Sequence, residues 1–152
     1  MLQSAYPYVL TLHNWLRWVV LLAGLLAIGS ALAGWGGSRP ANGSLRRLST
    51  IFVSALDLEL VIGLVLYFAL SPITLAAMQN FGAAMKQKEP RFFAVEHLTF
   101  MLLAVVCAHI GSVMARKGAT DAIRHRRAAI AYVLSLLLIL GGIPWWRPLL
   151  RF

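Results

Sequence analysis

The alternation of apolar and polar stretches divides the chain into four long hydrophobic runs joined by polar connections. The runs cover about residues 9–34, 49–70, 92–115 and 125–143. Each approaches the roughly 20 residues that a helix needs to cross the hydrocarbon layer of a bilayer. Inside that layer no water is available to the backbone, so a helix is the form that such a run adopts. The pattern therefore predicts four membrane-spanning helices.

The connections between the runs predict how the helices are arranged. The first and third connections are short, which favours an up-down-up-down four-helix bundle. In the second connection, residues 71–91, apolar side chains recur at helical spacing, which predicts a short helix lying on the membrane surface. The residues of its apolar face are Leu75, Met78, Phe81 and Met85. We expect an all-α integral membrane protein in which residues 1–152 form one domain.

The composition agrees with a chain that is embedded in lipid. Of its 152 residues, 60% are hydrophobic and 12% are charged, whereas roughly a quarter of the residues in an ordinary soluble domain are charged. The single cysteine, Cys107, lies within an apolar run and can form neither an internal disulfide nor a thiolate metal site. The chain has no glycine-rich phosphate loop, Ser-His-acid arrangement or zinc-type cysteine spacing, so its motifs predict neither hydrolysis nor phosphoryl transfer.

The basic residues, which give a formal net charge of +9, lie almost entirely outside the centres of the apolar runs. Eight flank the first and third connections: Arg39, Arg46, Arg47, Arg116, Lys117, Arg124, Arg126 and Arg127. Five lie at the opposite side: Lys86, Lys88, Arg91, Arg147 and Arg151. By the positive-inside rule, this excess places both termini outside, which in a bacterium is the periplasmic side of the inner membrane. No basic helix or RNA-reading aromatic motif stands clear of the membrane, so we expect these charges to meet the lipid bilayer and not a nucleic acid.

Two histidines lie at matching depths of two predicted helices. His13 is about five residues into the first apolar run, and His97 is about five residues into the third. Both helices run inward from the outer side, and helices one and three face each other across such a bundle. A haem iron with two axial histidines needs this arrangement. The alternative is that the two histidines are interfacial side chains that hold no cofactor.

Two charged residues stand beside these histidines. Arg17 follows His13 by four residues, so it lies on the same helix face, one turn deeper. Glu96 immediately precedes His97. Because a guanidinium stays charged, a buried arginine needs an anionic partner. We expect Arg17 to pair with a haem propionate or with Glu96, and in the second case it simply ties two helices together.

The other ionisable groups of the spans are Asp57, Glu59 and His109, with His125 at the inner boundary. His109 follows His97 by 12 residues, which turns it about 120° away at 3.6 residues per turn. One haem is therefore favoured over two, although a second pair made by His109 and His125 stays open. Asp57 is expected at the depth of His109, where a hydrogen bond or a step in a proton path is open to it. Asp57 and Glu59, two residues apart, point to different faces of their helix.

Four segments of the chain carry a resemblance to a protein family. They are 12–18 (LHNWLRW), 63–68 (GLVLYF), 91–97 (RFFAVEH) and 143–145 (IPW). In order and spacing, over nearly the whole chain, they resemble small bacterial four-helix membrane proteins labelled cytochrome b or cytochrome b-like. A more distant likeness is to the four-helix cytochrome b561 proteins, whose two stacked haems need histidine pairs that this sequence lacks. Asp57 and Glu59 also depart from the neutral or histidine side chains expected in the second helix of the group.

The resemblance implies haem b within the bundle and electron transfer in the membrane. The matching positions that would carry the haem are His13 and His97, with Arg17 and Glu96 beside them. On this basis we expect an electron-transfer protein rather than a stand-alone enzyme. It would pass electrons between a quinol pool or a larger respiratory complex and a periplasmic carrier.

Two alternatives to the cytochrome hypothesis stay open. The first is a haem-free structural or assembly subunit of a membrane complex, which predicts a direct contact between Arg17 and Glu96. The second is a small proton-coupled transporter, which predicts a water-accessible cavity that reaches Asp57. Its proton-carrying residues would be Asp57, Glu59 and His109.

Overall fold

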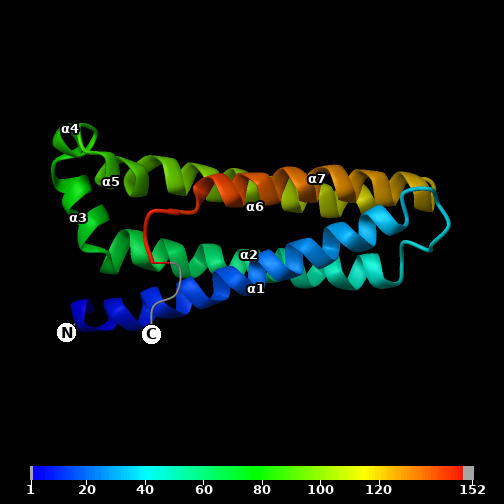
Figure 1. Cartoon of the computed structure of the whole chain (residues 1–152), viewed down its shortest axis with the longest axis horizontal. Helices are drawn as coiled ribbons and strands as arrows, with labels where there is room; N and C mark the ends of the chain where they lie inside the picture. The colour runs from blue at the N-terminus through cyan, green and yellow to red at the C-terminus, as the bar shows by residue number, and fades with distance from the viewer. Residues whose placement is uncertain (1, 149–152) are drawn as a thin grey trace.

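The computed structural model describes residues 2–148, and every regular element in this range is helical. A single 3-10 turn, Leu2–Ala5, precedes the first long helix. The four long helices are α1 (Tyr6–Ala33), α2 (Ser44–Val65), α6 (His97–Arg116) and α7 (Asp121–Gly142). They lie side by side along their length (Figure 1). The prediction of an all-helical protein is confirmed.

Within residues 2–148, three stretches of helix are long and apolar enough to cross a membrane. They are Tyr6–Ala33, Ser44–Leu70 and Lys88–Arg116, and they match the first three predicted runs apart from small shifts at their ends. Their outward surfaces are apolar; Leu22, for example, is 59% exposed. These three helices make the chain compatible with a protein that crosses the membrane several times. α7 covers the fourth predicted run but is not among these three, and its first two turns carry four charged residues: Asp121, Arg124, Arg126 and Arg127.

The order in which the long helices pack decides which of them face each other. α1 packs against α2 and α7, and α6 packs against the same two helices. α1 and α6 therefore lie across the group from each other, as the sequence predicts for the helices that carry His13 and His97. Figure 1 shows the connection from α1 to α2 at one end and the short helices that precede α6 at the other.

Small residues allow the long helices to approach closely. The alanines of the core are almost fully shielded; Ala27, Ala104 and Ala128 are each 0% exposed. Gly111 of α6 lies so close to Ala131 of α7 that a Cβ atom in its place would overlap the alanine methyl group. Helix pairs in lipid depend on this kind of contact, because lipid tails compete with apolar side chains and leave van der Waals packing as a main source of stability.

Three short helices connect α2 to α6 at one end of the molecule (Figure 1). They are α3 (Pro72–Gln79), α4 (Phe81–Ala84) and α5 (Lys88–Arg91). Ser71 caps α3, because its hydroxyl accepts a hydrogen bond from the backbone of Thr74 at 3.4 Å, and the proline at the first helical position suits a helix start. The second connection is thus helical, as its periodicity predicts, although it is divided into three pieces.

Two π-helical segments flank this connection. One, Leu66–Leu70, continues α2, and the other, Phe92–Glu96, leads directly into α6. A π-helical turn holds one residue more than an α-helical turn, and such turns are frequent at functional sites. The Tyr67 hydroxyl donates a hydrogen bond of 2.8 Å to the carbonyl of Ala94, which joins the two segments. The widened turns therefore stand opposite each other at the end of the molecule that holds His13 and His97.

Candidate functional site

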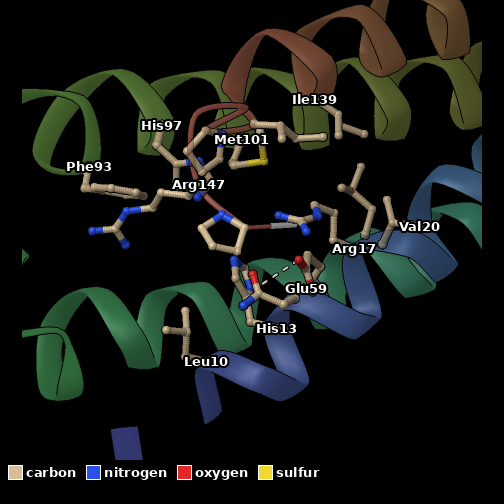
Figure 2. A pocket seen from close by; sticks show the side chains of 15 residues that line it. Leu10, His13, Arg17, Val20, Glu59, Phe93, His97, Met101, Ile139 and Arg147 are labelled. Carbon is tan, nitrogen blue, oxygen red and sulfur yellow. Dashed lines mark ion pairs between the residues drawn. The ribbon is translucent and has the colours of Figure 1, made fainter. Parts of the chain in front are cut away.

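His13 of α1 and His97 of α6 meet inside the group of helices. Their ring centres are 6.3 Å apart and their planes are inclined by 80°. Two imidazoles that bind one metal atom place their ring centres roughly 6 Å apart, because each metal–nitrogen bond measures about 2.0–2.1 Å. In Figure 2 both side chains extend into the same cavity from opposite helices. The pairing that the sequence predicts for these two histidines is confirmed as a spatial arrangement.

The imidazole of His97 is held by the last turn of α7. Its Nδ1 lies 2.7 Å from the carbonyl oxygen of Gly142. A carbonyl only accepts, so Nδ1 donates and Nε2 keeps its lone pair. The glycine makes this approach attainable, because a Cβ atom on Gly142 would lie 2.9 Å from Cβ of Phe100 and would overlap the end of Met101.

The imidazole of His13 is held by a carboxylate of α2. Its Nδ1 lies 3.2 Å from Oε1 of Glu59, whose residue is 7% exposed. Gly63, one helical turn further along α2, makes room for the ring, because a Cβ atom there would approach Cε1 of His13 to 3.2 Å. Metal-binding histidines almost always engage their second ring nitrogen in this way, with a carboxylate or a carbonyl. His97 follows that pattern through its hydrogen bond to Gly142, whereas His13 approaches Glu59 at ion-pair distance without hydrogen-bond geometry.

Cavities surround the histidine pair on several sides. Three of them, of about 70, 30 and 70 Å³, have both His13 and His97 in their walls. One of the two cavities of about 70 Å³ draws its wall from α1, α2, α6, α7 and the segment that follows α7 (Figure 2). Besides the two histidines, its lining includes Asn14, Arg17, Glu59, Phe93, Met101, Ile139, Ile143 and Arg147. The site is therefore a mostly apolar chamber with a few polar groups, the usual character of a cofactor or ligand pocket.

Two arginines reach this chamber. Arg17 points into it from α1, with Glu59 as the acidic residue whose charge acts on it. Arg147 lines it from the segment after α7 and is held by Glu89, with a distance of 2.6 Å between Nη2 and Oε1. The Arg147 guanidinium also lies 4.6 Å from the centre of the Phe93 ring. The chamber thus has cationic groups at its edge that suit an anionic part of a ligand.

Glu96 does not join the site. Its carboxylate accepts a hydrogen bond of 2.7 Å from Nε of Arg91, and its side chain is 39% exposed. It lines none of the three cavities around His13. Successive helical residues are about 100° apart, so turning His97 inward turns Glu96 away. The structure corrects the expected place of Glu96, and the acidic residue beside Arg17 is Glu59.

Glu59 is the site residue that the sequence interpretation underestimated. A signal for it exists in the periodicity of α2, because Glu59 continues a buried stripe at intervals of three or four residues. The other members of this stripe are Leu45, Ser49, Phe52 and Leu56. A carboxylate on the buried face of an apolar helix needs a polar partner, which would have directed attention to His13.

Asp57 and His109 form the pair that their matching depths predict. Nε2 of His109 and Oδ1 of Asp57 are 2.8 Å apart. The pair lies on the outside, with side chains 51% and 44% exposed. Asp57 lines none of the three cavities around His13. Asp57 and Glu59 do point to different faces of α2, as predicted.

His125 lies in different surroundings from His109, so the two do not form a second facing pair. It is 1% exposed and packs against Gly34, where a Cβ atom would overlap its ring. Within residues 2–148, no group of three or more His, Cys, Asp or Glu side chains could hold a metal ion. A metal at the His13–His97 site would therefore have only two protein ligands.

Comparison of the chain with protein-family models, with curated proteins and with solved structures found no match. The interpretation of the site consequently depends on its own geometry.

Proposed function

We propose that this protein is a membrane-embedded b-type cytochrome with one haem between His13 and His97. The observation that carries the proposal is the histidine pair, with ring centres 6.3 Å apart and each Nδ1 close to an oxygen atom of Glu59 or Gly142. A metal with only two protein ligands needs a macrocycle for its other positions, and haem supplies one. The family resemblance of the sequence leads to the same cofactor.

Each residue of the site has a separate task in this proposal. His13 and His97 would hold the iron, and Glu59 and the Gly142 carbonyl lie where they would orient the two rings. Arg17 and Arg147 neutralise the haem propionates, because a guanidinium pairs well with a carboxylate. When bound, the haem supplies reversible one-electron transfer, at a potential that the ligands and the surrounding apolar walls adjust.

The proposed place of the protein is the bacterial inner membrane. All four long helices cross it in an up-down-up-down bundle, with α7 as the fourth crossing and α3 on the outer surface. The excess of basic residues near the connections 34–43 and 117–120 supports a cytoplasmic location for that end. Both termini and the histidine site then lie near the periplasmic face, where the haem exchanges electrons with a quinol, a respiratory complex or a periplasmic carrier.

The size of the cavity favours one competing function, a haem-free structural or assembly subunit. The main cavity of about 70 Å³ holds a few water molecules, and a macrocycle enters only if side chains and residues 143–148 move outward. In a haem-free protein, the contacts of His13 with Glu59 and of His97 with Gly142 act as clamps between helices. The Arg17–Glu96 contact that this alternative first suggested is replaced by the Arg91–Glu96 pair.

An absorption spectrum of the detergent-purified protein distinguishes the two functions. The protein is produced in cells with ample haem and measured oxidised and then dithionite-reduced. The cytochrome proposal predicts a Soret band, sharp α and β bands of low-spin haem b on reduction, and about one haem per chain. A well-folded but colourless protein that also fails to bind added haem would replace this proposal with the structural subunit.

A further inference from the structure

A second cavity, at the far end of the molecule from the histidine site, is lined by polar and basic residues. It measures about 320 Å³ and lies between the start of α2 and the end of α6. Its polar wall includes Arg46, Ser49, Thr50, Ser112, Arg116 and Arg124. It shares no lining residue with the three cavities around His13. This basic cavity is therefore separate from the proposed haem site.

The charge of the basic cavity is positive and only weakly compensated. Three arginines line it and no acidic residue does. The acid nearest to them is Asp121, whose Oδ1 is 3.7 Å from Nη1 of Arg124 and also accepts a hydrogen bond of 3.2 Å from the backbone of Ala41. Within residues 2–148, the Arg46 guanidinium has no ion-pair or hydrogen-bond partner. Such a cluster of cations favours a bound anion.

Neutral oxygen atoms hold the other two arginines in place. Nη1 of Arg116 donates a hydrogen bond of 2.8 Å to the hydroxyl of Ser112. Nε of Arg124 donates a hydrogen bond of 2.8 Å to the carbonyl of Gly118. Each of these bonds uses one of the five N–H donors of a guanidinium and leaves the charge unneutralised. The two side chains are thus oriented beforehand, with donors to spare for an anion with several oxygen atoms.

A buried hydroxyl beside the basic cavity also lacks a partner. Tyr132 of α7 is 0% exposed, and its hydroxyl has no hydrogen-bond partner within residues 2–148. It lies next to Ser49 and Ser112, both of which line the cavity. Tyr132 itself does not line the cavity, but together with Ser49 and Ser112 it adds hydroxyl groups to the surroundings of the arginines.

We propose that the basic cavity binds a phosphate group, as carried by the headgroup of an anionic phospholipid. Arginine forks match the geometry of phosphate oxygens, and basic pockets between membrane helices on the cytoplasmic side bind anionic headgroups. The surface beside the cavity suits the acyl chains, because Ile51 of α2 and Ile110 of α6 are 53% and 50% exposed. Free inorganic phosphate shares the same chemistry, so the test separates the two sources.

The test is a thermal melt of the delipidated protein in a neutral detergent. Short-chain phosphatidylglycerol, short-chain phosphatidylcholine and sodium phosphate are added separately at constant ionic strength. The proposal predicts a saturable rise of the melting temperature with phosphatidylglycerol and little with phosphatidylcholine. In the double variant R46Q/R116Q the apparent affinity falls at least tenfold, because two charge-assisted contacts to the phosphate are lost. A rise with sodium phosphate alone keeps the phosphate site and assigns it to soluble phosphate.

The matched control is R47Q, because Arg47 is an exposed neighbour of Arg46 that does not line the basic cavity. R47Q keeps wild-type affinity if the site is specific. Circular dichroism and the melting temperature without additive show whether R46Q/R116Q still folds, and R46Q alone replaces it if it does not. Absence of saturable stabilisation by either phosphate source, or equal weakening in R47Q and R46Q, would overturn the proposal.

Discussion

Two carboxylates of α2, Glu59 and Asp57, each contact a histidine, but one contact is buried and the other is exposed. Glu59 is 7% exposed and lies 3.2 Å from Nδ1 of His13, inside the group of helices. The Asp57 side chain is 44% exposed and lies 2.8 Å from Nε2 of His109, on the outer surface. Residues two apart on a helix are separated by about 200° around its axis. A single step of two residues therefore moves a histidine–carboxylate contact from the core to the outer surface of the helices.

The comparison shows that the choice of ring nitrogen matters as much as the pair of residue types. The inner carboxylate contacts Nδ1, and Nε2 of His13 stays available as a ligand. The outer carboxylate takes Nε2 of His109, which leaves that histidine without the ring nitrogen that metal ligands commonly use. In the proposed function the inner contact prepares a binding site, whereas the outer contact pairs two polar groups on the exposed surface of the helices.

The largest expected effect is on the amount of bound haem, and it distinguishes His13 and His97 from His109. His13→Ala and His97→Ala are each expected to abolish bound haem, because in the proposed function each of these histidines would hold the iron. His109→Ala should retain about one haem per chain. The measurement is the ratio of reduced α-band absorbance to protein. A full complement of haem in both inner variants would show that neither histidine binds the iron.

The second prediction compares the two carboxylates. Glu59→Gln is expected to weaken haem binding by about 10–100-fold, the usual cost of removing the partner of a metal-binding histidine. Asp57→Asn should leave haem affinity unchanged, because its partner lies outside the cavity. Titration of haem into the apoprotein, followed at the Soret band, gives both affinities. If both variants weaken haem binding equally, the distinction between the inner and outer contacts is lost.

The third prediction concerns Gly142, whose carbonyl accepts the hydrogen bond from His97. Gly142→Ala is expected to destabilise the protein by about 1–3 kcal/mol, because the added methyl group overpacks a closed contact with Phe100 and Met101. Gly29→Ala is the matched control, since nothing lies within 4 Å of a Cβ atom there. Titration with a denaturing detergent measures both. Equal stability of the two variants would mean that Gly142 is not closely packed against α6.

The smallest effect tests the hydrogen bond between the two π-helical segments. Tyr67→Phe removes the bond of 2.8 Å to the carbonyl of Ala94, and interhelical bonds of this kind in membrane proteins average about 0.6 kcal/mol. Tyr8→Phe is the control because Tyr8 is 77% exposed. The same titration measures the difference between the variants. A larger loss in Tyr8→Phe would contradict the expected role of Tyr67.

Residue spacing predicted the helices and the depth of their polar groups. The runs of apolar residues gave the three helices that suit a membrane, and counting from their ends brought His13 level with His97 and Asp57 level with His109. Depth depends only on the rise per residue, which is nearly constant along a helix. For that reason the pairing of His13 with His97 and the contact of His109 with Asp57 were accessible without a structure in their approximate position, whereas the contact of His13 with Glu59 was not.

Rotation around the helix axes was harder to predict than depth. Glu96 was expected at the cavity because it neighbours His97, but adjacent residues of a helix diverge by about 100°. The π-helical turn Phe92–Glu96 shifts the faces further, and no feature of the sequence marks it. The Gly142 carbonyl and the basic cavity were also not predicted, because both arise from the approach of helices that are distant along the chain.

The hydrogen bond between His97 and Gly142 has a consequence for the order of biosynthesis. The 45 residues between them take roughly 2–9 seconds to synthesise at about 5–20 residues per second. During that interval the segments that carry His13 and Glu59 are already synthesised, whereas the imidazole of His97 lacks the carbonyl that orients it. The contact of His97 with α7 is therefore made late, and in the proposed function haem would meet the two histidines before residues 143–148 cover the site.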